Sequence, residues 1–256
     1  MQDGSLIPRF GRARRDPSLA VLEGLHPLKH ALRFGGRILE VVCSDPLQLD
    51  SLAGELAPDV RAHVLTLARP VAPAVFAKLA PLAPSTGVIA LAERPSLDLS
   101  RILADPRAAP VILLEDPRDL GNIGACVRVA AAADIAGVLS TGGHDPWHPD
   151  ALRGAAGLHY ALPVLRVGDL AAIEAADRPL LAIDPGGDPL ALERLPPRAL
   201  LAFGGERYGL SDALARRADA RVSIPMRAGV SSLNLATSVA AVLFAWRLAA
   251  AAAPRA

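Results

Sequence analysis

The sequence predicts an α/β protein in two parts, of which the second is a mainly parallel sheet with helices between its strands. Its 256 residues are enough for one large domain or two modest ones with a real core. Short apolar segments alternate with helix-like segments through both halves, which indicates crossover units and parallel strands. The segment VILLEDP at 111–117 opens with a continuous apolar run over 111–114, as in strands that are buried on both faces.

The individual elements follow from apolar spacing and from turn residues. In the front half the spacing predicts helices over 26–34, 46–56 and 71–79 and strands over 37–44, 63–68 and 87–93. In the back half it predicts a helix over 122–133 and strands over 111–117, 137–141, 161–167, 180–184, 199–205 and 221–226. The stretch 93–110 holds several prolines and few long apolar runs, which is typical of a linker.

This organisation predicts four regions along the chain. They are a basic flexible arm over 1–20, a small α/β domain over 21–95, a linker over 96–109 and a larger α/β domain over 110–256. The formal net charge of +1 gives no global nucleic-acid signature. The first 37 residues nevertheless carry seven basic against three acidic side chains. This surplus either contacts phosphates or belongs to a solvated arm.

The cysteines and the apolar segments indicate the cellular compartment and whether the chain crosses a membrane. Cys43 and Cys126 form no CxxC pair, so we expect no disulfide framework or zinc site, and a reducing cytoplasm fits. The N-terminus has no apolar core of a secretory signal. The stretch 233–253 is long enough to cross a membrane, but it is mostly alanine. It also contains four polar side chains: Asn234, Thr237, Ser238 and Arg247. We expect a buried or interface helix there and no membrane partner.

Polar segments follow several of the predicted strands, where parallel sheets bind ligands. In EDPRDLGNIGACVR (115–128), Asn122 is a plausible helix N-cap. Arg128 lies nearly two turns further along a helix that is otherwise small and apolar. A lone guanidinium in such surroundings is expected to find an anionic partner or a wet cleft.

The segment FGGERYGLSD (203–212) places two glycines at a strand end, where the backbone can approach a ligand closely. Ser211 or Asp212 is able to cap the helix that follows. The segment is neither a Walker loop nor a GxGxxG turn that opens directly into a helix. Taken alone, Glu206 is either part of a surface turn or a group that holds an arginine or a substrate.

In PMRAGVSSLN (225–234), Ser231 is the predicted N-cap of the last helix. Ser232 and Asn234 then stand at helix positions for which neither is a strong former. The free N–H groups of this first turn can face a polar or anionic ligand.

Histidines and acids gather in HDPWHPD (144–150), which makes a metal site conceivable. Two prolines make this segment a rigid turn, and no further ligand cluster appears, so we expect no metal. His26 and His30 have helical spacing but lack the adjacent glutamate of a metalloprotease motif, which favours packing roles.

Three motifs in order carry a resemblance to a known family. Asn-x5-Arg follows one strand, FGxExxGLS follows another, and IPM-x5-SLN precedes the last helix. Together they resemble the SpoU/TrmH-type RNA 2′-O-methyltransferases of the SPOUT class. The resemblance covers about 110–248, and it extends more weakly to EGLHPLKHAL and GVIALAE in the front half. Those front segments resemble the small RNA substrate-binding domain that many of these enzymes carry.

The resemblance implies a trefoil-knotted methyltransferase domain that binds S-adenosyl-L-methionine largely through backbone groups. The matching cofactor positions here are Gly204, Ile224, Met226 and Leu233, and the turn at Thr141 is a further candidate. Small residues and backbone amides suit adenine recognition, because they supply shape and hydrogen bonds without bulk.

The resemblance also implies methyl transfer to a ribose 2′-hydroxyl of structured RNA. The substrate and catalytic positions correspond to Asn122, Arg128, Glu206, Ser232 and Asn234. Arg128 would either activate the hydroxyl as a base or stabilise the developing alkoxide and a nearby phosphate. Many relatives have Arg-x-Ser-x-Gly where this chain has RGAAG, so Ala155 replaces the serine.

Family membership further implies a homodimer that packs through the last helix, with RNA lying across both subunits. Ribosomal RNA is favoured over transfer RNA as substrate because the small front domain is present. Two rival hypotheses remain: a non-catalytic RNA-binding protein on the same fold, and an α/β enzyme that uses another nucleotide.

Overall fold

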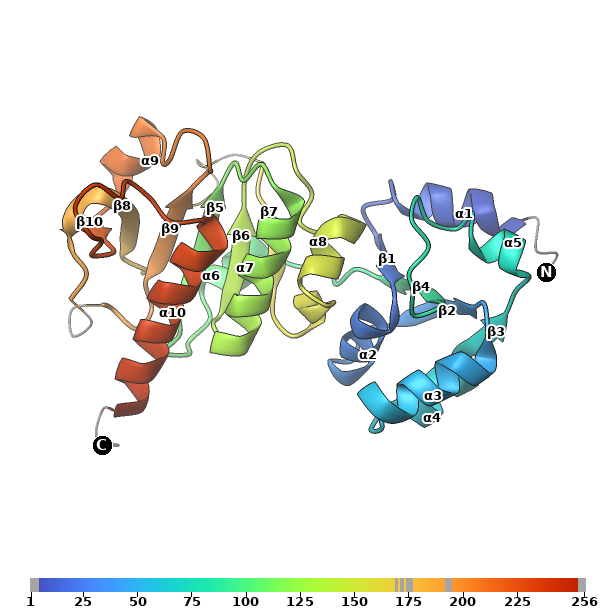
Figure 1. Cartoon of the computed structure of the whole chain (residues 1–256). Helices are drawn as coiled ribbons and strands as arrows, with labels where there is room; N and C mark the ends of the chain where they lie inside the picture. The colour runs from blue at the N-terminus through green and yellow to red at the C-terminus, as the bar shows by residue number, and fades with distance from the viewer. Residues whose placement is uncertain (1–4, 169, 171–172, 174–176, 192–194, 253–256) are drawn as a thin grey trace. The chain divides into compact units, whose positions relative to one another are not determined.

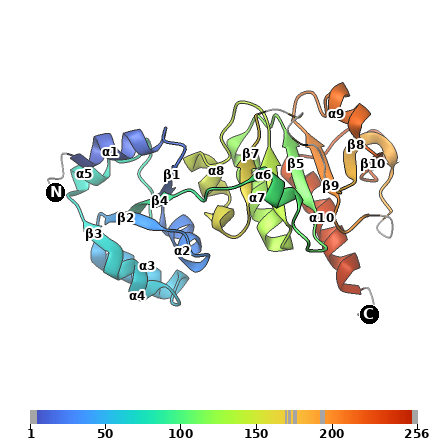
Figure 2. The same ribbon diagram turned by 180° about the vertical axis from the view of Figure 1, so that it is seen from behind.

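The computed structural model describes residues 5–168, 170, 173, 177–191 and 195–252. These residues fall into two compact units, and Figures 1 and 2 show the ribbon from opposite sides. One unit holds the chain up to Ser96 together with Trp147–Ala161. The other holds Leu97–Pro146 and the chain from Leu162 onward. The residues 1–4 of the predicted arm and residue 253 of the predicted last helix lie outside the described residues.

The first unit, here called the small unit, is a four-stranded sheet with the order β1-β4-β2-β3. β4 pairs antiparallel with both β1 and β2, whereas β2 and β3 are parallel. Its elements are α1 (Leu6–Ala13), β1 (Leu19–Glu23), α2 (Leu25–Arg33), β2 (Ile38–Cys43), α3 (Pro46–Leu56), α4 (Arg61–Leu67), β3 (Ala68–Pro70), α5 (Pro73–Phe76), β4 (Val88–Glu93), α8 (Pro149–Gly154) and a 3₁₀ turn (Leu158–Tyr160).

Two features of the small unit differ from the sequence prediction. Where a free basic arm is expected, α1 packs Phe10 fully inside the apolar core, and β1 follows as an edge strand. Where a strand is expected over 63–68, the chain forms α4, with Val64 as its fully buried residue. A short apolar run satisfies either periodicity, and the core contact decides between them.

The segment 147–161 also joins the small unit, although the sequence predicts it within the larger domain. Arg153 of α8 donates to Glu23 at 2.9 Å, and Tyr160 donates to the Glu93 carbonyl at 3.1 Å. Arg14 reaches the other oxygen of the buried Glu23 carboxylate at 2.5 Å. A buried carboxylate needs such partners. These contacts join residues up to 130 positions apart, so no local pattern announces them.

The second unit, here called the large unit, is a six-stranded sheet with the order β10-β8-β9-β5-β6-β7, and all its strand pairs are parallel. Its elements are α6 (Leu99–Leu103), β5 (Val111–Glu115), α7 (Leu120–Ala133), β6 (Gly137–Ser140), β7 (Val164–Arg166), β8 (Leu180–Pro189), β9 (Leu200–Gly204), α9 (Asp212–Arg217), β10 (Ala220–Ser223) and α10 (Leu235–Ala252). The predicted α/β class with a mainly parallel sheet is confirmed.

The core of the large unit lies between the sheet and its helices. β5 is buried along its whole length, as the apolar run predicts for a central strand. α7 and α10 pack against each other on one face of the sheet, and α6 lies on the other face (Figures 1 and 2). β5 and β9 are neighbours in register, with Glu115 beside Gly204. The loops that leave these two strands therefore start side by side.

Candidate active site

Three side chains from distant motifs form one hydrogen-bonded network at the carboxyl edge of the large sheet. The Asn122 Nδ2 group donates to Glu206 Oε1 at 2.8 Å, and the Asn234 Nδ2 group donates to Asn122 Oδ1 at 3.0 Å. Asn122 lies in the first turn of α7, Glu206 follows β9, and Asn234 directly precedes α10. The structure thus brings together one residue from each of the three motifs that the sequence singled out.

Glu206 is held at both carboxylate oxygens. Its Oε2 accepts a hydrogen bond from the Arg118 backbone amide at 2.9 Å, while Asn122 occupies Oε1. Desolvation by the surrounding loop acts to raise the pKa of Glu206. The hydrogen bonds from Arg118 and Asn122 favour the charged form and outweigh it, so the net pKa lies below its ordinary value. Glu206 is therefore an ionised anchor that fixes the orientation of Asn122.

The N-caps of α7 and α10 differ from the predicted caps, Asn122 and Ser231. Asp119 caps α7 by accepting from the Asn122 amide at 2.7 Å, which leaves the Asn122 side chain for Glu206. Asn234, rather than Ser231, satisfies the first turn of α10: its Oδ1 accepts from Ala236 at 2.9 Å and from Thr237 at 3.3 Å. The chain stays non-helical through Ser232 and Leu233, so α10 begins later than the apolar pattern suggests. In the loop after β9, Ser211 caps α9, as one of the two predicted candidates.

A cavity of about 560 Å³ lies beside this network. Four of the five predicted cofactor residues line it: Gly204, Ile224, Met226 and Leu233. Glu206, Ser232 and Asn234 line it as well, and Phe203 and Leu235 add apolar surface. A hollow of this size, mixing backbone, apolar side chains and a few fixed polar groups, is typical of small-molecule sites at the strand ends of α/β sheets.

The glycines beside the cavity are required by close packing. A Cβ atom on Gly204 would lie 2.0 Å from the carbonyl carbon of Gly209, and one on Gly205 would lie 2.7 Å from the Asp116 carbonyl oxygen. Gly209 has a φ of +68°, which favours glycine. The loop 205–209 can therefore fold back on the end of β9 only because these positions have no side chain.

Three predicted site residues are not among those that line the cavity: Asn122, which contacts two lining residues, Glu206 and Asn234, and also Thr141 and Arg128. The buried Thr141 hydroxyl accepts from the Asp116 amide at 3.0 Å, so this residue fixes the turn after β5. Arg128 is exposed on α7 and is not among the residues that line the cavity. It lies six positions after Asn122, which places the two on different faces of the helix. Within the described residues Arg128 has no hydrogen bond or ion pair.

Sequence reasoning missed some of the cavity. Asp184 and Pro185 line it from the middle of β8, just after the part of that strand that pairs with β9, together with Ser238 from α10. Asp184 is held by Arg221 at 2.9 Å and by the Gly186 amide at 2.7 Å. The signal was present, because Asp184 ends a predicted parallel strand and 185–188 follows it, and the strand-end rule applies there equally.

The remaining candidates are not among the residues that line this cavity. In HDPWHPD, the His148 ring accepts from the Asp150 amide at 3.2 Å, which is a local turn. The part of the chain that the structure describes holds no group of three or more potential metal ligands. Ala155 is fully buried at the end of α8. Both cysteines are free and buried. Among the described residues, no helix has the length and hydrophobicity needed to cross a membrane.

Together, the parallel sheet, the strand-end cavity and the polar network define an α/β enzyme of the kind that binds a small-molecule ligand at its strand ends. Residues 109–244, more than half of the chain, match the SpoU rRNA Methylase family. The protein belongs to this family, and the resemblance read from its three motifs is confirmed.

Known relatives agree with this assignment. The chain is 30% identical over 234 residues to a 23S rRNA (uridine(2479)-2′-O)-methyltransferase of Streptomyces viridochromogenes, covering 86% of this chain and 79% of that protein. It is 28% identical over 259 residues to a 23S rRNA (adenosine(1067)-2′-O)-methyltransferase of Streptomyces azureus, covering 90% and 87%. The crystal structure of the SpoU methyltransferase AviRb from S. viridochromogenes with AdoMet superposes with a TM-score of 0.77 at 27% identity, covering 96% of this chain and 99% of that one.

Proposed function

We propose that this protein methylates a ribose 2′-hydroxyl of structured RNA, with S-adenosyl-L-methionine as methyl donor and ribosomal RNA as the favoured substrate. The observation that carries the proposal is the network of Asn122, Glu206 and Asn234 beside a strand-end cavity. The relatives support the reaction, since two of them are named 23S rRNA 2′-O-methyltransferases that act on different bases.

The cavity fits the methyl donor. Gly204 and Gly209 offer backbone, and Phe203 and Leu235 offer apolar surface, which is the combination that an adenosyl group requires. We assign Gly204, Ile224, Met226 and Leu233 to its binding. When bound, the donor supplies an electrophilic methyl group on a sulfonium. Thr141 contributes indirectly, by holding the turn at Asp116. The trefoil knot stays a prediction from the family.

The chain's own polar groups orient the acceptor. A 2′-hydroxyl is a poor nucleophile until its proton is drawn away, so alignment and charge stabilisation are the tasks of the site. Ser232 and Asn234 line the cavity and can hold the hydroxyl, while Glu206 fixes Asn122 and thereby Asn234. The ionised Glu206 has both oxygens engaged, which suits an anchor rather than a base.

Arg128 is assigned to the RNA rather than to the donor. Its guanidinium is exposed and, among the described residues, has no ion-pair partner, so it is available to a phosphate next to the target ribose. A guanidinium stays protonated at neutral pH, and we therefore assign it to charge stabilisation, with water or a phosphate oxygen accepting the proton.

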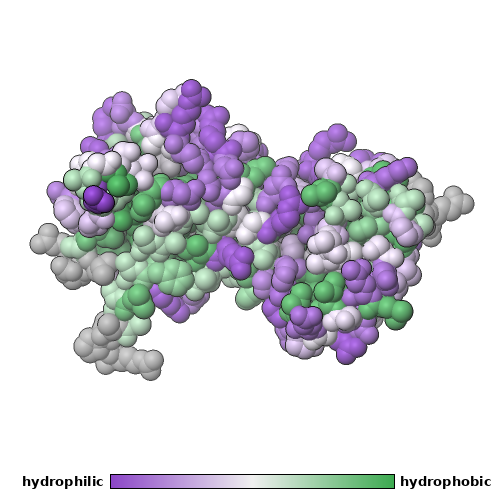
Figure 3. Space-filling model, viewed as in Figure 1, coloured by the Kyte–Doolittle hydropathy of each residue, from purple (hydrophilic) through white to green (hydrophobic). Residues whose placement is uncertain are grey.

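The surface of α10 supports a homodimer. Phe244 and Leu248 are 41% and 69% exposed on this helix, which belongs to the large unit. Figure 3 shows apolar colour along α10. A second copy that packs on this face would cover these side chains. Sedimentation of the native protein and of Leu248→Glu tests the proposal, because the charged variant should be monomeric.

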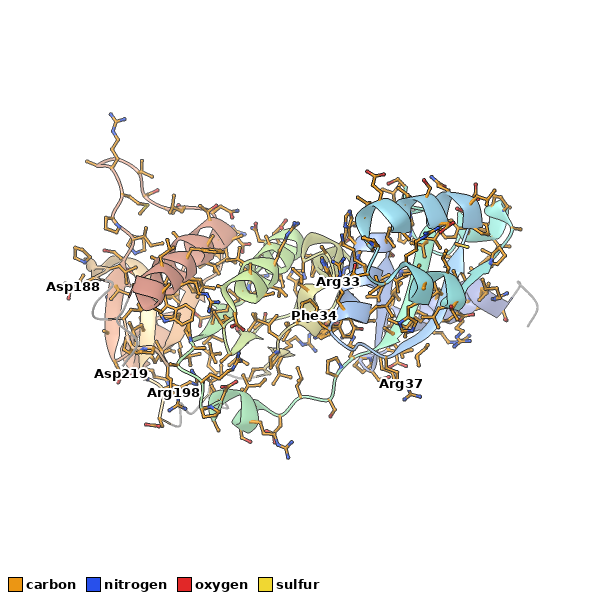
Figure 4. The ribbon with its side chains drawn as sticks, turned by 90° about the horizontal axis from the view of Figure 1, so that it is seen from below. Arg33, Phe34, Arg37, Asp188, Arg198 and Asp219 are labelled. Atoms are coloured by element: carbon orange, nitrogen blue, oxygen red, sulfur yellow. The ribbon has the colours of Figure 1, made fainter. Side chains whose placement is uncertain are left out.

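The small unit is proposed as an RNA substrate-binding domain. Arg33 and Phe34 lie at the end of α2, and Arg37 follows in the next turn (Figure 4). Phe34 is 49% exposed, and the side chains of Arg33 and Arg37, which pair with Asp59 and Glu93, keep 30% and 74% of their surface exposed. Exposed aromatic and guanidinium groups are the usual partners of unpaired bases and phosphates. The presence of this unit favours ribosomal RNA over transfer RNA as the substrate.

The buried free cysteines and the RNA substrate support a place of action in the cytoplasm.

The decisive experiment incubates the protein with radiolabelled donor and total RNA from cells that lack the gene. Transfer to the 2′-oxygen makes the adjacent linkage resistant to alkaline hydrolysis, which a methylated base does not. We expect alkali-resistant label with the native protein and a loss of about a hundredfold or more with Arg128→Ala. Arg101→Ala, which removes an exposed arginine of α6, should keep the native rate. RNA binding without transfer would instead favour the non-catalytic reading.

A further inference from the structure

The loop 205–209 is a closed turn beside the cofactor cavity, and it carries the exposed side chains of Arg207 and Tyr208. The Gly209 amide donates to the Gly205 carbonyl at 2.9 Å, and the two residues form an isolated β-bridge. Between them, Glu206 is fixed by Asn122 and by the Arg118 amide. Arg207 and Tyr208 therefore stand at the tip of a turn whose base is anchored.

Tyr208 is exposed in an unusual way. Tyr208 is 75% exposed, although its ring carries much apolar surface. The Arg207 guanidinium carbon lies 5.1 Å from the centre of this ring, within the range of a cation–π contact. The guanidinium thus covers part of the ring and holds it in place, while most of the ring stays open.

A second cavity of about 290 Å³ lies against this tip. Tyr208, Asp116 and Arg118 line it, and Gly205, Arg207 and Gly209 line both this cavity and the larger one. This volume lies near the lower end of small-ligand pockets, about 300 Å³, which leaves room for a planar ring system. The two hollows thus lie on the two sides of one loop.

Both carboxylates of the second cavity already have partners. Arg118 holds the Asp116 carboxylate at 2.7 Å, and the Glu115 carboxylate accepts from the Ser211 amide at 2.7 Å and from its hydroxyl at 2.6 Å. The two carboxylates and the two guanidiniums that line the cavity, those of Arg118 and Arg207, balance in formal charge, so no net positive charge favours a phosphate here. A neutral planar group would find an aromatic face, a guanidinium and a paired donor and acceptor.

We propose that Tyr208 and Arg207 form a stacking platform for a base of the RNA substrate, next to the ribose that is methylated, with the Asp116–Arg118 pair facing the edge of that base. The inference rests on the proposed function and deepens it, because it assigns base recognition to two residues between Glu206 and Gly209. Base recognition by stacking on an aromatic side chain targets unpaired nucleotides, so the substrate nucleotide lies in a loop or bulge.

The test compares Tyr208→Phe, Tyr208→Ala and Tyr208→Leu with the native protein. Three quantities are measured: kcat/KM for RNA from gene-deleted cells, RNA affinity by fluorescence anisotropy, and the dissociation constant of S-adenosylhomocysteine by calorimetry. Loss of a base–aromatic stack lowers kcat/KM and RNA affinity about five- to a hundredfold. We expect this loss in the Ala and Leu variants, native values within about twofold in the Phe variant, and unchanged cofactor binding in all three. Leu47→Ala, at a side chain that is 81% exposed on α3, is the control for loss of exposed apolar surface.

Each other outcome overturns the inference in a recognisable way. If Tyr208→Ala keeps the native kcat/KM and RNA affinity, no base stacks on the ring. If Tyr208→Phe loses as much as Tyr208→Ala, the hydroxyl and not the ring face is what matters. If cofactor affinity falls by the same factor as RNA affinity, the ring supports the loop and not the base. If the native protein transfers no methyl group, the proposed function fails, and the anisotropy series still decides whether Tyr208 contacts RNA.

Discussion

Replacing Asn234 by alanine and by aspartate should separate its two roles. One role is structural, because Oδ1 accepts from the Ala236 and Thr237 amides and caps α10. The other belongs to the site, because Nδ2 donates to Asn122 at 3.0 Å. Alanine removes both roles. Aspartate keeps an acceptor for the cap but has no donor for Asn122.

The magnitudes follow from these contacts. Loss of an N-cap costs about 1 kcal/mol, and loss of a neutral hydrogen bond costs about 1 kcal/mol when both groups are shielded from water. Asn234 is exposed, so the second contribution is the smaller, and Asn234→Ala should lose about 1.5 kcal/mol of stability in all. A carboxylate at a helix N-terminus gains about 0.3–1 kcal/mol, so Asn234→Asp should stay within about 0.5 kcal/mol of the native protein.

Activity should not follow stability. Both variants release Asn122 from Asn234, so the polar groups that hold the acceptor lose their fixed geometry. A misplacement of this kind costs about a hundredfold in rate. Methyl transfer with radiolabelled donor measures this loss, and urea unfolding measures stability. Hydrogen exchange of the Ala236 and Thr237 amides reports the cap directly, and it should accelerate in the alanine variant alone.

The reasoning is refuted by either of two results. Native methyl transfer in Asn234→Asp would show that the bond to Asn122 does not matter for the site. Unchanged protection of the Ala236 amide in Asn234→Ala would show that Asn234 is not the cap of α10.

Two further perturbations probe the loop after β9. Gly204→Ala places a Cβ atom 2.0 Å from the Gly209 carbonyl carbon, so this variant should bind the cofactor at least about tenfold more weakly by calorimetry. The control Gly143→Ala, whose Cβ would have no atom within 4 Å, should keep the native affinity. Equal affinities in the two variants would contradict the role of close packing at Gly204. Because the pKa of Glu206 lies below 4.5, its charged form stabilises the fold above that pH, and this contribution is lost as the pH falls through the folded-state pKa. Glu206→Gln should therefore flatten the fall in urea stability below about pH 4.5, and identical slopes in both proteins would contradict the assignment.

The fold of the large unit was largely predictable because its strands carry their own signal. β5 and β9 are apolar along their length, and the loops after them hold glycine and polar residues. Helix starts were less predictable. Ser231 and Asn234 are both good caps by type, and only the path of the chain after β10 decides that the helix begins at Leu235. These two candidate caps lie three positions apart in the loop before α10.

The features that escaped prediction depend on contacts between distant residues. α8 joins the small unit through Arg153 and Glu23, which are 130 positions apart. Arg128 was expected to find an anionic partner or a wet cleft, because an arginine among small apolar residues is costly when buried. In the structure, Arg128 lies on the exposed side of α7, where water satisfies it until a partner arrives. Neither outcome is encoded in a window of neighbouring residues.

The order of the three motifs has a physical reason. Asn122 and Glu206 are 84 positions apart, and Asn122 and Asn234 are 112 apart, yet each pair is joined by one hydrogen bond. Each residue stands where an element begins or ends, and parallel strands bring such points to one edge of the sheet. A single side chain at one of these points explains itself as a cap or a turn. A cap or a turn does not explain why Asn122, Glu206 and Asn234 bind one another, because each of their segments can form without the other two. The polar groups at the start of the most apolar helix are therefore explained by the site, and the site exists only when all three segments are in place.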